Sequence, residues 1–182
     1  EVPFMRPPEL ATDVSPDIDW VAYTLKKLDE AGRRYDCFSI LRPTNPFRQP
    51  ETIRRAWKAF QAEEGVDSLR AVEKCQQHPG KMWVVRGKRM MPLLPLGPAE
   101  KPWHSCQYPS LPEVYVQNAS LEIAWSRVVF EDRTIAGNVV MPFFTVDYEG
   151  FDVNNEYDWQ LAEQMVQNGD VKLPAVPQPP IN

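Results

Sequence analysis

Three short segments of the chain carry the side chains best suited to chemistry. The first is ILRPTNPFR (40–48), in which two prolines stiffen the backbone. Arg42, Thr44, Asn45 and Arg48 offer donors there to an anionic or hydroxyl-rich ligand. A proline-stiffened turn with solvated arginines would have the same composition. We therefore treat the segment as a candidate binding loop and leave the simpler alternative open.

The second segment is QHPGKMW (77–83). Lys81 lies next to a turn and beside two apolar residues, where an ammonium group could contact a carboxylate or a phosphate. An ordinary surface lysine is the alternative. His78 precedes a proline and fits a turn better than a general base. Lys81 is thus the candidate of this segment.

The third segment is DYEGFDVNNEYDW (147–159), which gathers the carboxylates of Asp147, Glu149 and Asp152 ahead of an expected helix. Mg²⁺ prefers oxygen ligands, often one or two carboxylates together with substrate phosphates. Asp152 and Asn154 are two residues apart, which places them on one face of an extended segment. Acids are also common in the first turn of any helix, so the spacing alone leaves both explanations open.

Composition excludes several other classes of protein. The net charge is −5, which argues against a nucleic-acid partner. No apolar run is long enough to span a membrane. Three cysteines without a CxxC pair predict free thiols and a cytoplasmic location. GxSxG, HExxH and Walker A motifs are absent from the sequence.

Hydrophobic periodicity predicts the elements that position these segments. We expect helices at 16–31, 50–64 and 155–168, strands at 35–41, 67–72, 113–125 and 139–146, and a hairpin of 81–85 with 90–94. The first strand, the second helix and the second strand then form a βαβ unit with a parallel pair. Ligands bind beyond the carboxyl ends of such strands, which is where the three segments lie.

The predicted fold is a three-layer α/β core with a mostly parallel sheet, formed by residues 1–85 and 128–182. A β-rich insertion, residues 86–127, interrupts it. The insertion contains a long apolar run at 90–96 and several aromatic residues, which have few partners in so small a lobe. We therefore predict that the insertion forms a homodimer.

Five segments, in order, resemble the acylneuraminate cytidylyltransferase family, the CMP-sialic acid synthetases. VPFMRPPELATDVSP is similar to the RP–ELA–D segment that precedes a helix, and ILRPTNPFR to LLQPTSPLR. HPGKMW resembles HP–KMW, LPEVYVQNASLEI resembles the LP–Y–NGAIYI strand, and GFDVNNEYDWQLAE resembles the DID or DVN motif with its acidic helix. The resemblance covers essentially the whole chain and implies a Rossmann-like nucleotidyltransferase core.

The resemblance implies transfer of CMP from CTP to a 2-keto acid sugar, with release of pyrophosphate and with Mg²⁺ as cofactor. Asp152 would be a catalytic residue and metal ligand, and Asn154 stands where the family often has a second aspartate. Lys81 would be the second catalytic residue, since it matches the lysine that reaches the sugar. Arg42 replaces a glutamine that lies close to the sugar. Further substrate-binding positions are expected at Thr44, Asn45, Arg48, Gln117 and Asn118.

Departures from the family pattern qualify this expectation. Tyr108 stands where sialic acid enzymes have an arginine, so a related 2-keto sugar, or another subfamily, is as well supported as sialic acid itself. The family's glycine-rich phosphate loop precedes the matching segments and is not in this sequence. We therefore expect the chain to be inactive alone. The alternative is a non-catalytic remnant that dimerises and binds a sugar acid.

Overall fold

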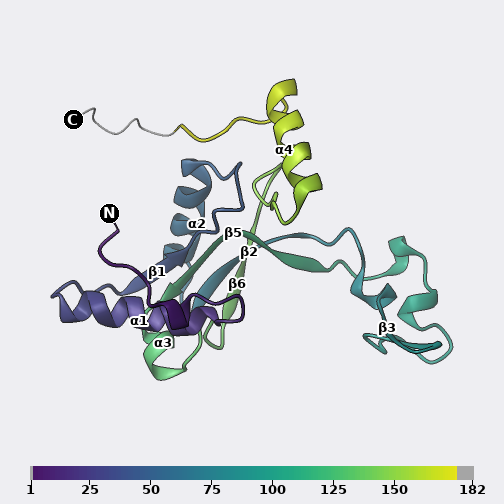
Figure 1. Ribbon diagram of the computed structural model, residues 1–182. Coiled ribbons are helices and arrows are strands. Elements are labelled where there is room, and N and C mark those ends of the chain that lie inside the picture. Colours follow the sequence, from purple (N-terminus) through teal and green to yellow (C-terminus); the bar gives the residue numbers. More distant parts are fainter. Residues whose placement is uncertain (1, 176–182) are drawn as a thin grey trace. The chain divides into compact units, whose positions relative to one another are not determined.

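The computed structural model describes residues 2–175 and divides into two compact units (Figure 1). The larger unit runs up to Ala71 and resumes at Asn118, and the smaller unit is Val72–Gln117. Helices of the described part are not long and apolar enough to cross a membrane. Each unit is considered by itself below.

The sheet of the larger unit has the strand order β1-β5-β2-β6. Its strands are β1 (Cys37–Ile40), β2 (Ser68–Lys74), β5 (Tyr115–Trp125) and β6 (Val140–Phe144). β1 and β5 are antiparallel. The Trp125 N–H donates to the Asp67 carbonyl, which places the end of β5 beside the start of β2. The Asp67 N–H donates to the Val139 carbonyl, so β2 and β6 begin side by side.

The mixed α/β class is confirmed, but the prediction of a mostly parallel sheet with β1 next to β2 is wrong. β5 lies between these two strands and opposes the direction of both. The right-handed crossover rule constrains the direction and hand of a βαβ connection, and it does not require the two strands to be neighbours. Because β1, β2 and β6 still run the same way, their carboxyl ends lie at one edge of the sheet.

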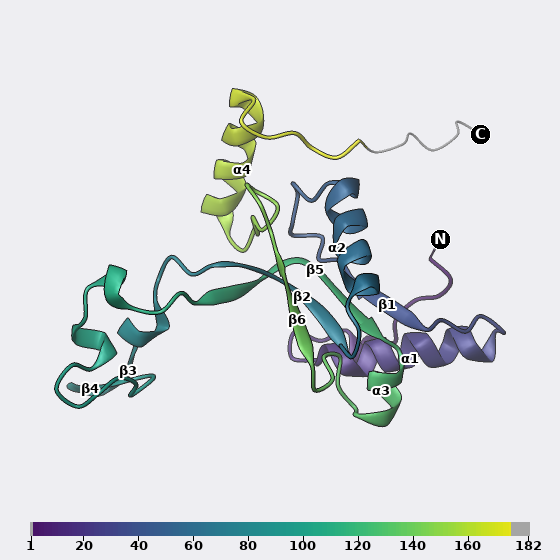
Figure 2. The ribbon, with the colours of Figure 1, turned by 180° about the vertical axis from the view of Figure 1, so that it is seen from behind.

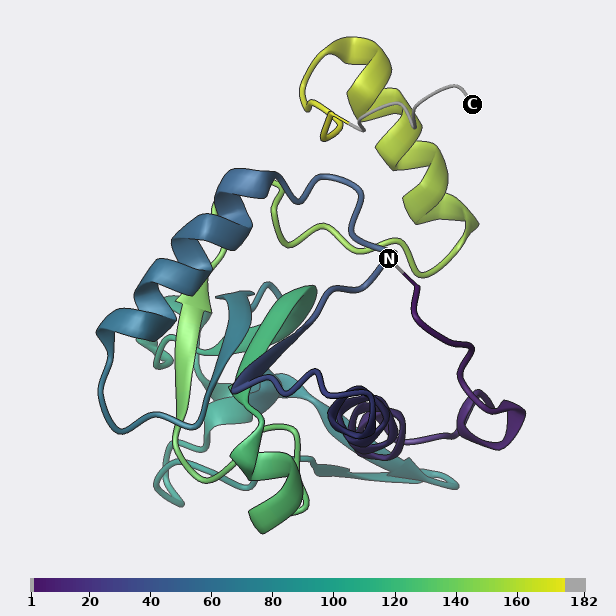
Figure 3. The ribbon, with the colours of Figure 1, turned by 90° about the vertical axis from the view of Figure 1, so that its left-hand side faces the viewer.

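Helices cover both faces of this sheet (Figure 3). α2 (Pro50–Ala62) buries Ala56 and Phe60 against Leu69, Leu121 and Phe143 on one face. On the other face, α1 (Asp17–Glu30) and α3 (Arg127–Glu131) form a second core. Its buried residues are Val21, Leu25, Ile40, Ala124, Val128 and Val129. The alternation of β5 explains the division, because successive side chains of a strand point to opposite faces.

α4 (Glu156–Asn168) closes the larger unit near the segments of chemical interest. The Asn155 side chain accepts a hydrogen bond from the Asp158 N–H, and Gly169 ends the helix with φ of 79°. Ala162 and Met165 pack against Phe47 in a third core cluster. The loop after β1 therefore packs against α4 through Phe47.

The smaller unit contains a two-stranded antiparallel sheet of β3 (Trp83–Arg86) and β4 (Arg89–Pro92) (Figure 2). Gly87 has φ of 61° in the tight turn between them, a conformation that suits glycine. The predicted hairpin is thus confirmed. Short 3₁₀ turns occur at Pro8–Leu10 in the larger unit and at Pro79–Lys81, Trp103–Ser105 and Tyr108–Ser110 in the smaller one.

The hairpin leaves large apolar side chains exposed, with exposed fractions of 68% for Val85, 56% for Met90 and 53% for Met91. We expect self-association through this surface, in a dimer that buries about 1,600 Å² in total. Sedimentation velocity at high concentration should then show a species heavier than 21.0 kDa. Replacing Met90 by Glu should shift it toward the monomer, whereas Lys88→Glu on the turn should not. A single 21.0 kDa species at all concentrations would contradict the prediction.

Candidate functional site

The loop after β1 is organised around the backbone carbonyl of Arg42. The Asn45 N–H donates to this carbonyl at 3.4 Å, and Nη1 and Nη2 of Arg48 donate to it at 3.2 and 3.1 Å. Arg48 Nη1 also donates to the Ser120 carbonyl on β5. Burial lowers the pKa of Arg48. The Arg48 guanidinium thus ties the loop to the sheet, and the predicted substrate contact of this residue stays a prediction.

Asn45 joins this loop to the one that follows β6. Its Nδ2 donates to the carbonyls of Glu149 at 2.7 Å and Phe151 at 2.9 Å. The Val153 N–H donates to the Thr44 carbonyl at 2.9 Å. Both amide hydrogens of Asn45 are therefore committed within the chain, and the two loops form one platform at the carboxyl edge of the sheet.

Glu149 anchors the second loop to α2. Its carboxylate accepts from Thr52 Oγ1 at 2.6 Å, from Arg55 Nη2 at 2.6 Å and from the Val146 N–H at 2.9 Å. Burial alone would raise the pKa of Glu149, but the bonds from Arg55, Thr52 and Val146 outweigh it and the pKa is lowered. This carboxyl, one of three selected from the sequence, holds the loop in place.

The anchoring by Glu149 gives a pH dependence with a defined sign. A carboxyl with a lowered pKa stabilises the fold above its unfolded pKa of about 4.3, and this contribution is lost as pH falls through the folded pKa. At pH 7 we expect Glu149→Gln to unfold at lower urea concentration than the wild type. The difference in urea midpoint between Glu149→Gln and the wild type should become smaller below about pH 4. Glu163 is exposed, and Glu163→Gln should unfold at the same urea concentration as the wild type. A difference in urea midpoint for Glu149→Gln that grows on acidification would contradict the role given to Glu149.

An ionic network lies on the α1 face of the sheet beside the platform. Arg42 donates through Nη1 to Asp17 Oδ1 at 3.2 Å and through Nη2 to Asp17 Oδ2. Its Nη2 is 3.6 Å from Glu122 Oε1, and Glu122 also pairs with Arg70. The Arg42 contact lowers the pKa of Asp17, to which Trp20 Nε1 also donates at 2.8 Å.

Asp17, Arg70 and Glu122 were not selected from the sequence. A signal existed for two of them. Arg70 and Glu122 each stand between two apolar residues of a predicted strand, and their side chains are only 11% and 9% exposed in the structure. Opposite charges at buried positions of two strands suggest a buried pair, since an unpaired charge is costly there.

Asp152 lies at the end of the second loop, within electrostatic reach of Arg42. Asp17, through its hydrogen bond and its charge, and Asp152, through its charge alone, raise the pKa of Arg42. Among the described residues, Asp152 Oδ1 is buried and has no hydrogen-bond partner. Asn154 has an exposed side chain, and its N–H donates to Asp158 Oδ2 at 2.9 Å. A buried carboxylate oxygen without a donor fits a cation ligand.

Asn118 lies on β5 in the same unit. Its Nδ2 donates to Thr145 Oγ1 at 2.9 Å, and its Oδ1 accepts from the Ser120 N–H at 3.2 Å. The side chain therefore connects β5 to the start of the loop that carries Asp152.

Lys81 and Gln117 belong to the smaller unit. Lys81 Nζ donates to the His104 carbonyl at 3.3 Å and lies 5.4 Å from the centre of the Tyr108 ring. His78 is buried, and its Nδ1 accepts from the Gly80 N–H at 3.0 Å, as expected of a turn residue. The structure thus brings together the candidates of the first and third segments, and Lys81 remains a separate prediction.

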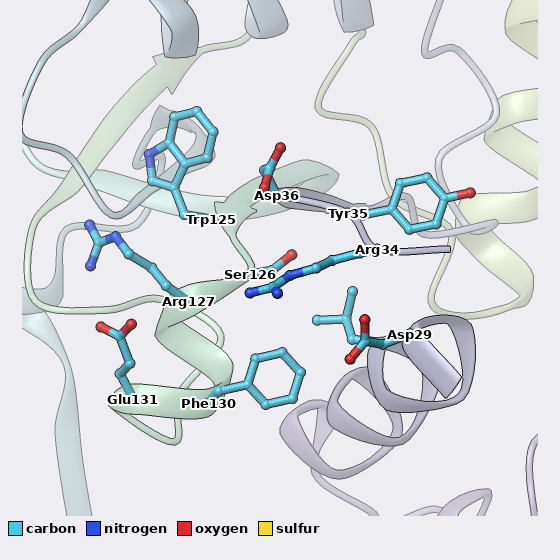
Figure 4. Close-up of a pocket in the computed structure, with 10 residues that line it drawn as sticks. Asp29, Arg34, Tyr35, Asp36, Trp125, Ser126, Arg127, Phe130 and Glu131 are labelled. Carbon is cyan, nitrogen blue, oxygen red and sulfur yellow. The ribbon is translucent and has the colours of Figure 1, made fainter. Parts of the chain in front are cut away.

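A pocket of about 580 Å³ opens where β1 begins and β5 ends (Figure 4). Its lining comes from α1, from the segment leading into β1, from the end of β5 and from α3. The residues selected from the sequence are not in this lining. Those in the loops of the larger unit follow the carboxyl ends of β1 and β6, whereas this pocket lies at the amino end of β1. A second pocket of about 510 Å³, mostly apolar, lies between the loop after β1 and α4.

No family model matches the chain. The chain is similar to CMP-N,N'-diacetyllegionaminic acid synthase of Legionella pneumophila subsp. pneumophila (strain Philadelphia 1), with 26% identity over 170 residues. The match covers 91% of this chain and 69% of that protein. The chain is thus a distant relative of a synthase named for a CMP-linked sugar acid.

Proposed function

We propose that this protein acts as a cytidylyltransferase, transferring CMP from CTP to a 2-keto acid sugar with release of pyrophosphate. The name of the distant relative supports this reaction class. The structural observation that carries the proposal is the platform built by Asn45, which presents Asp152 with its buried, unpartnered oxygen near Arg42. A carboxylate and a guanidinium at one sheet edge suit a substrate pair of phosphates and an acidic sugar.

The proposed reaction asks little covalent chemistry of the protein. A hydroxyl oxygen of the sugar forms a bond to the α-phosphorus of CTP, the bond from that phosphorus to the pyrophosphate oxygen breaks, and the hydroxyl proton leaves. Positioning and charge neutralisation then account for most of the rate. Mg²⁺ bound here would neutralise phosphate charge. Within residues 2–175, no three His, Cys, Asp or Glu side chains gather to hold a metal.

Each candidate has a proposed role in this scheme. Asp152 would hold the ion, with the amide oxygen of Asn154 as a second ligand and with phosphate and water completing the shell. Arg42 would face the sugar acid. Asn118 would contact the sugar from the larger unit. Lys81 and Gln117 belong to the smaller unit, and their contacts with the sugar are separate proposals. Thr44 and Arg48 support the binding loop.

Pyrophosphate release tests the proposal. The protein expressed from its complete gene, supplied with CTP, Mg²⁺ and a panel of 2-keto sugars, should release pyrophosphate and form a CMP-sugar. UTP in place of CTP is the nucleotide control. If the complete protein binds the sugars without forming any CMP-sugar, the non-catalytic alternative holds instead.

A further inference from the structure

The contact between Asp17 and Arg42 occupies the guanidinium that the proposed function needs. Two of the five N–H donors of Arg42 meet both oxygens of the Asp17 carboxylate. A two-oxygen contact of this kind is the geometry with which arginine also binds the carboxylate of a ligand. A substrate carboxylate would therefore compete with Asp17 for the same donors.

The four charged side chains of the network differ in solvent exposure, and exposure decides which of them can change partners. The side chains of Arg42 and Asp17 are 35% and 27% exposed, whereas those of Arg70 and Glu122 are 11% and 9% exposed. Breaking a buried pair leaves an uncompensated charge, but a partly exposed pair is weak and can change partners. The pair of Arg42 with Asp17 can therefore exchange partners, whereas the more buried pair of Arg70 with Glu122 stays fixed.

Asp17 compensates the positive charge of Arg42 when no substrate is bound. Within this network of four side chains, the positive charges of Arg42 and Arg70 are matched by the negative charges of Asp17 and Glu122. If a substrate carboxylate replaces Asp17 at Arg42, the guanidinium keeps one carboxylate partner throughout, and no buried charge is left unpaired. The first turn of α1, where Asp17 lies, favours a negative charge even without Arg42.

We propose that Asp17 is an internal counter-ion of Arg42, and that the carboxylate of an acidic sugar substrate displaces it. This inference rests on the proposed function, because it names the group that the sugar presents. It makes Arg42 the residue that distinguishes a sugar acid from a neutral sugar.

Calorimetric titration of the 182-residue chain tests the inference, with N-acetylneuraminic acid and its neutral methyl ester as probes. The acid should bind more tightly than the ester. Asp17→Asn keeps the size of the side chain and removes the competitor, so it should tighten binding of the acid about fivefold and leave the ester unchanged. Asp19→Asn removes the same charge from the same helix turn, away from Arg42, and should behave like the wild type.

Arg42→Gln should abolish the preference for the acid over the ester. The two variants are independent, so either one decides the question if the other does not fold. Weaker or unchanged binding of the acid by Asp17→Asn, a preference that survives in Arg42→Gln, or no binding of either probe would overturn the inference. Failure of the proposed function has a different readout, because it would leave CTP unused by the protein from the complete gene whichever acid binds.

Discussion

Replacing Asp152 by Ala in the protein expressed from its complete gene should lower turnover by orders of magnitude. The buried Oδ1 of this residue has no partner among the described side chains, and the carboxylate is the candidate ligand for Mg²⁺. Neutralisation of phosphate charge by a bound ion is worth several kcal/mol, and each ~1.4 kcal/mol changes a rate tenfold. Asp152→Asn removes the charge with little change of shape and should show most of the same loss. Pyrophosphate release measures both.

Asp147→Asn provides the matched control. Asp147 lies in the same loop, is exposed, and has φ of 49°, a conformation that asparagine tolerates well. The substitution therefore removes one loop carboxylate without straining the backbone, and turnover should stay near normal. Near-normal turnover for Asp152→Ala would refute the assignment. An equal loss in Asp147→Asn would show that loop charge in general, and not Asp152, is what matters.

Hydrophobic periodicity predicted the helices and strands of the larger unit closely, because the spacing of apolar residues within one segment defines its buried face. The run from Cys37 to Ile40 and the stripe that includes Phe60 both pack as expected. The strand order could not be predicted in the same way. The placement of β5 between β1 and β2 depends on pairing between segments far apart in the chain, and no local pattern records it.

Helix ends show a smaller failure of local rules. Ser15 and Pro16 resemble a cap and first turn, but α1 begins at Asp17, and within residues 2–175 no side chain caps it. Ser15 Oγ instead accepts from the Thr12 N–H at 3.1 Å. A serine can satisfy a turn before the helix as well as the helix itself, and only the path of the preceding chain decides between them.

The candidate site was partly predictable for a related reason. Loops that follow strands of one direction meet at one edge of a sheet, so all three segments were expected there, and the structure joins the first and the third. The residue type of a polar side chain in such a loop does not say whether it binds a ligand or forms a hydrogen bond to the backbone. Asn45 and Arg48 were selected as substrate donors, and the structure commits both to main-chain carbonyls.

The role of Asn45 leads to a second large effect, on stability. Asn45 is 5% exposed, and its amide bonds the carbonyls of Glu149 and Phe151. Asn45→Ala removes both bonds and leaves two carbonyls of the platform without their donors. Each such loss costs about 1–3 kcal/mol, so the free energy of unfolding should fall by about 3 kcal/mol. Urea denaturation of the 182-residue chain measures the change.

Asn154→Ala makes the same substitution at an exposed side chain, where the bond to Asp158 comes from the backbone N–H and is kept. It should change the free energy of unfolding by less than about 0.5 kcal/mol. Asn45→Asp sharpens the test, because it keeps the shape of the side chain but replaces the donor by a carboxylate facing two carbonyl oxygens. It should destabilise the fold at least as much as Asn45→Ala at pH 7. If Asn45→Ala instead unfolds at the urea concentration of the wild type, the two loops are held together by other contacts, and the platform under Asp152 does not depend on Asn45.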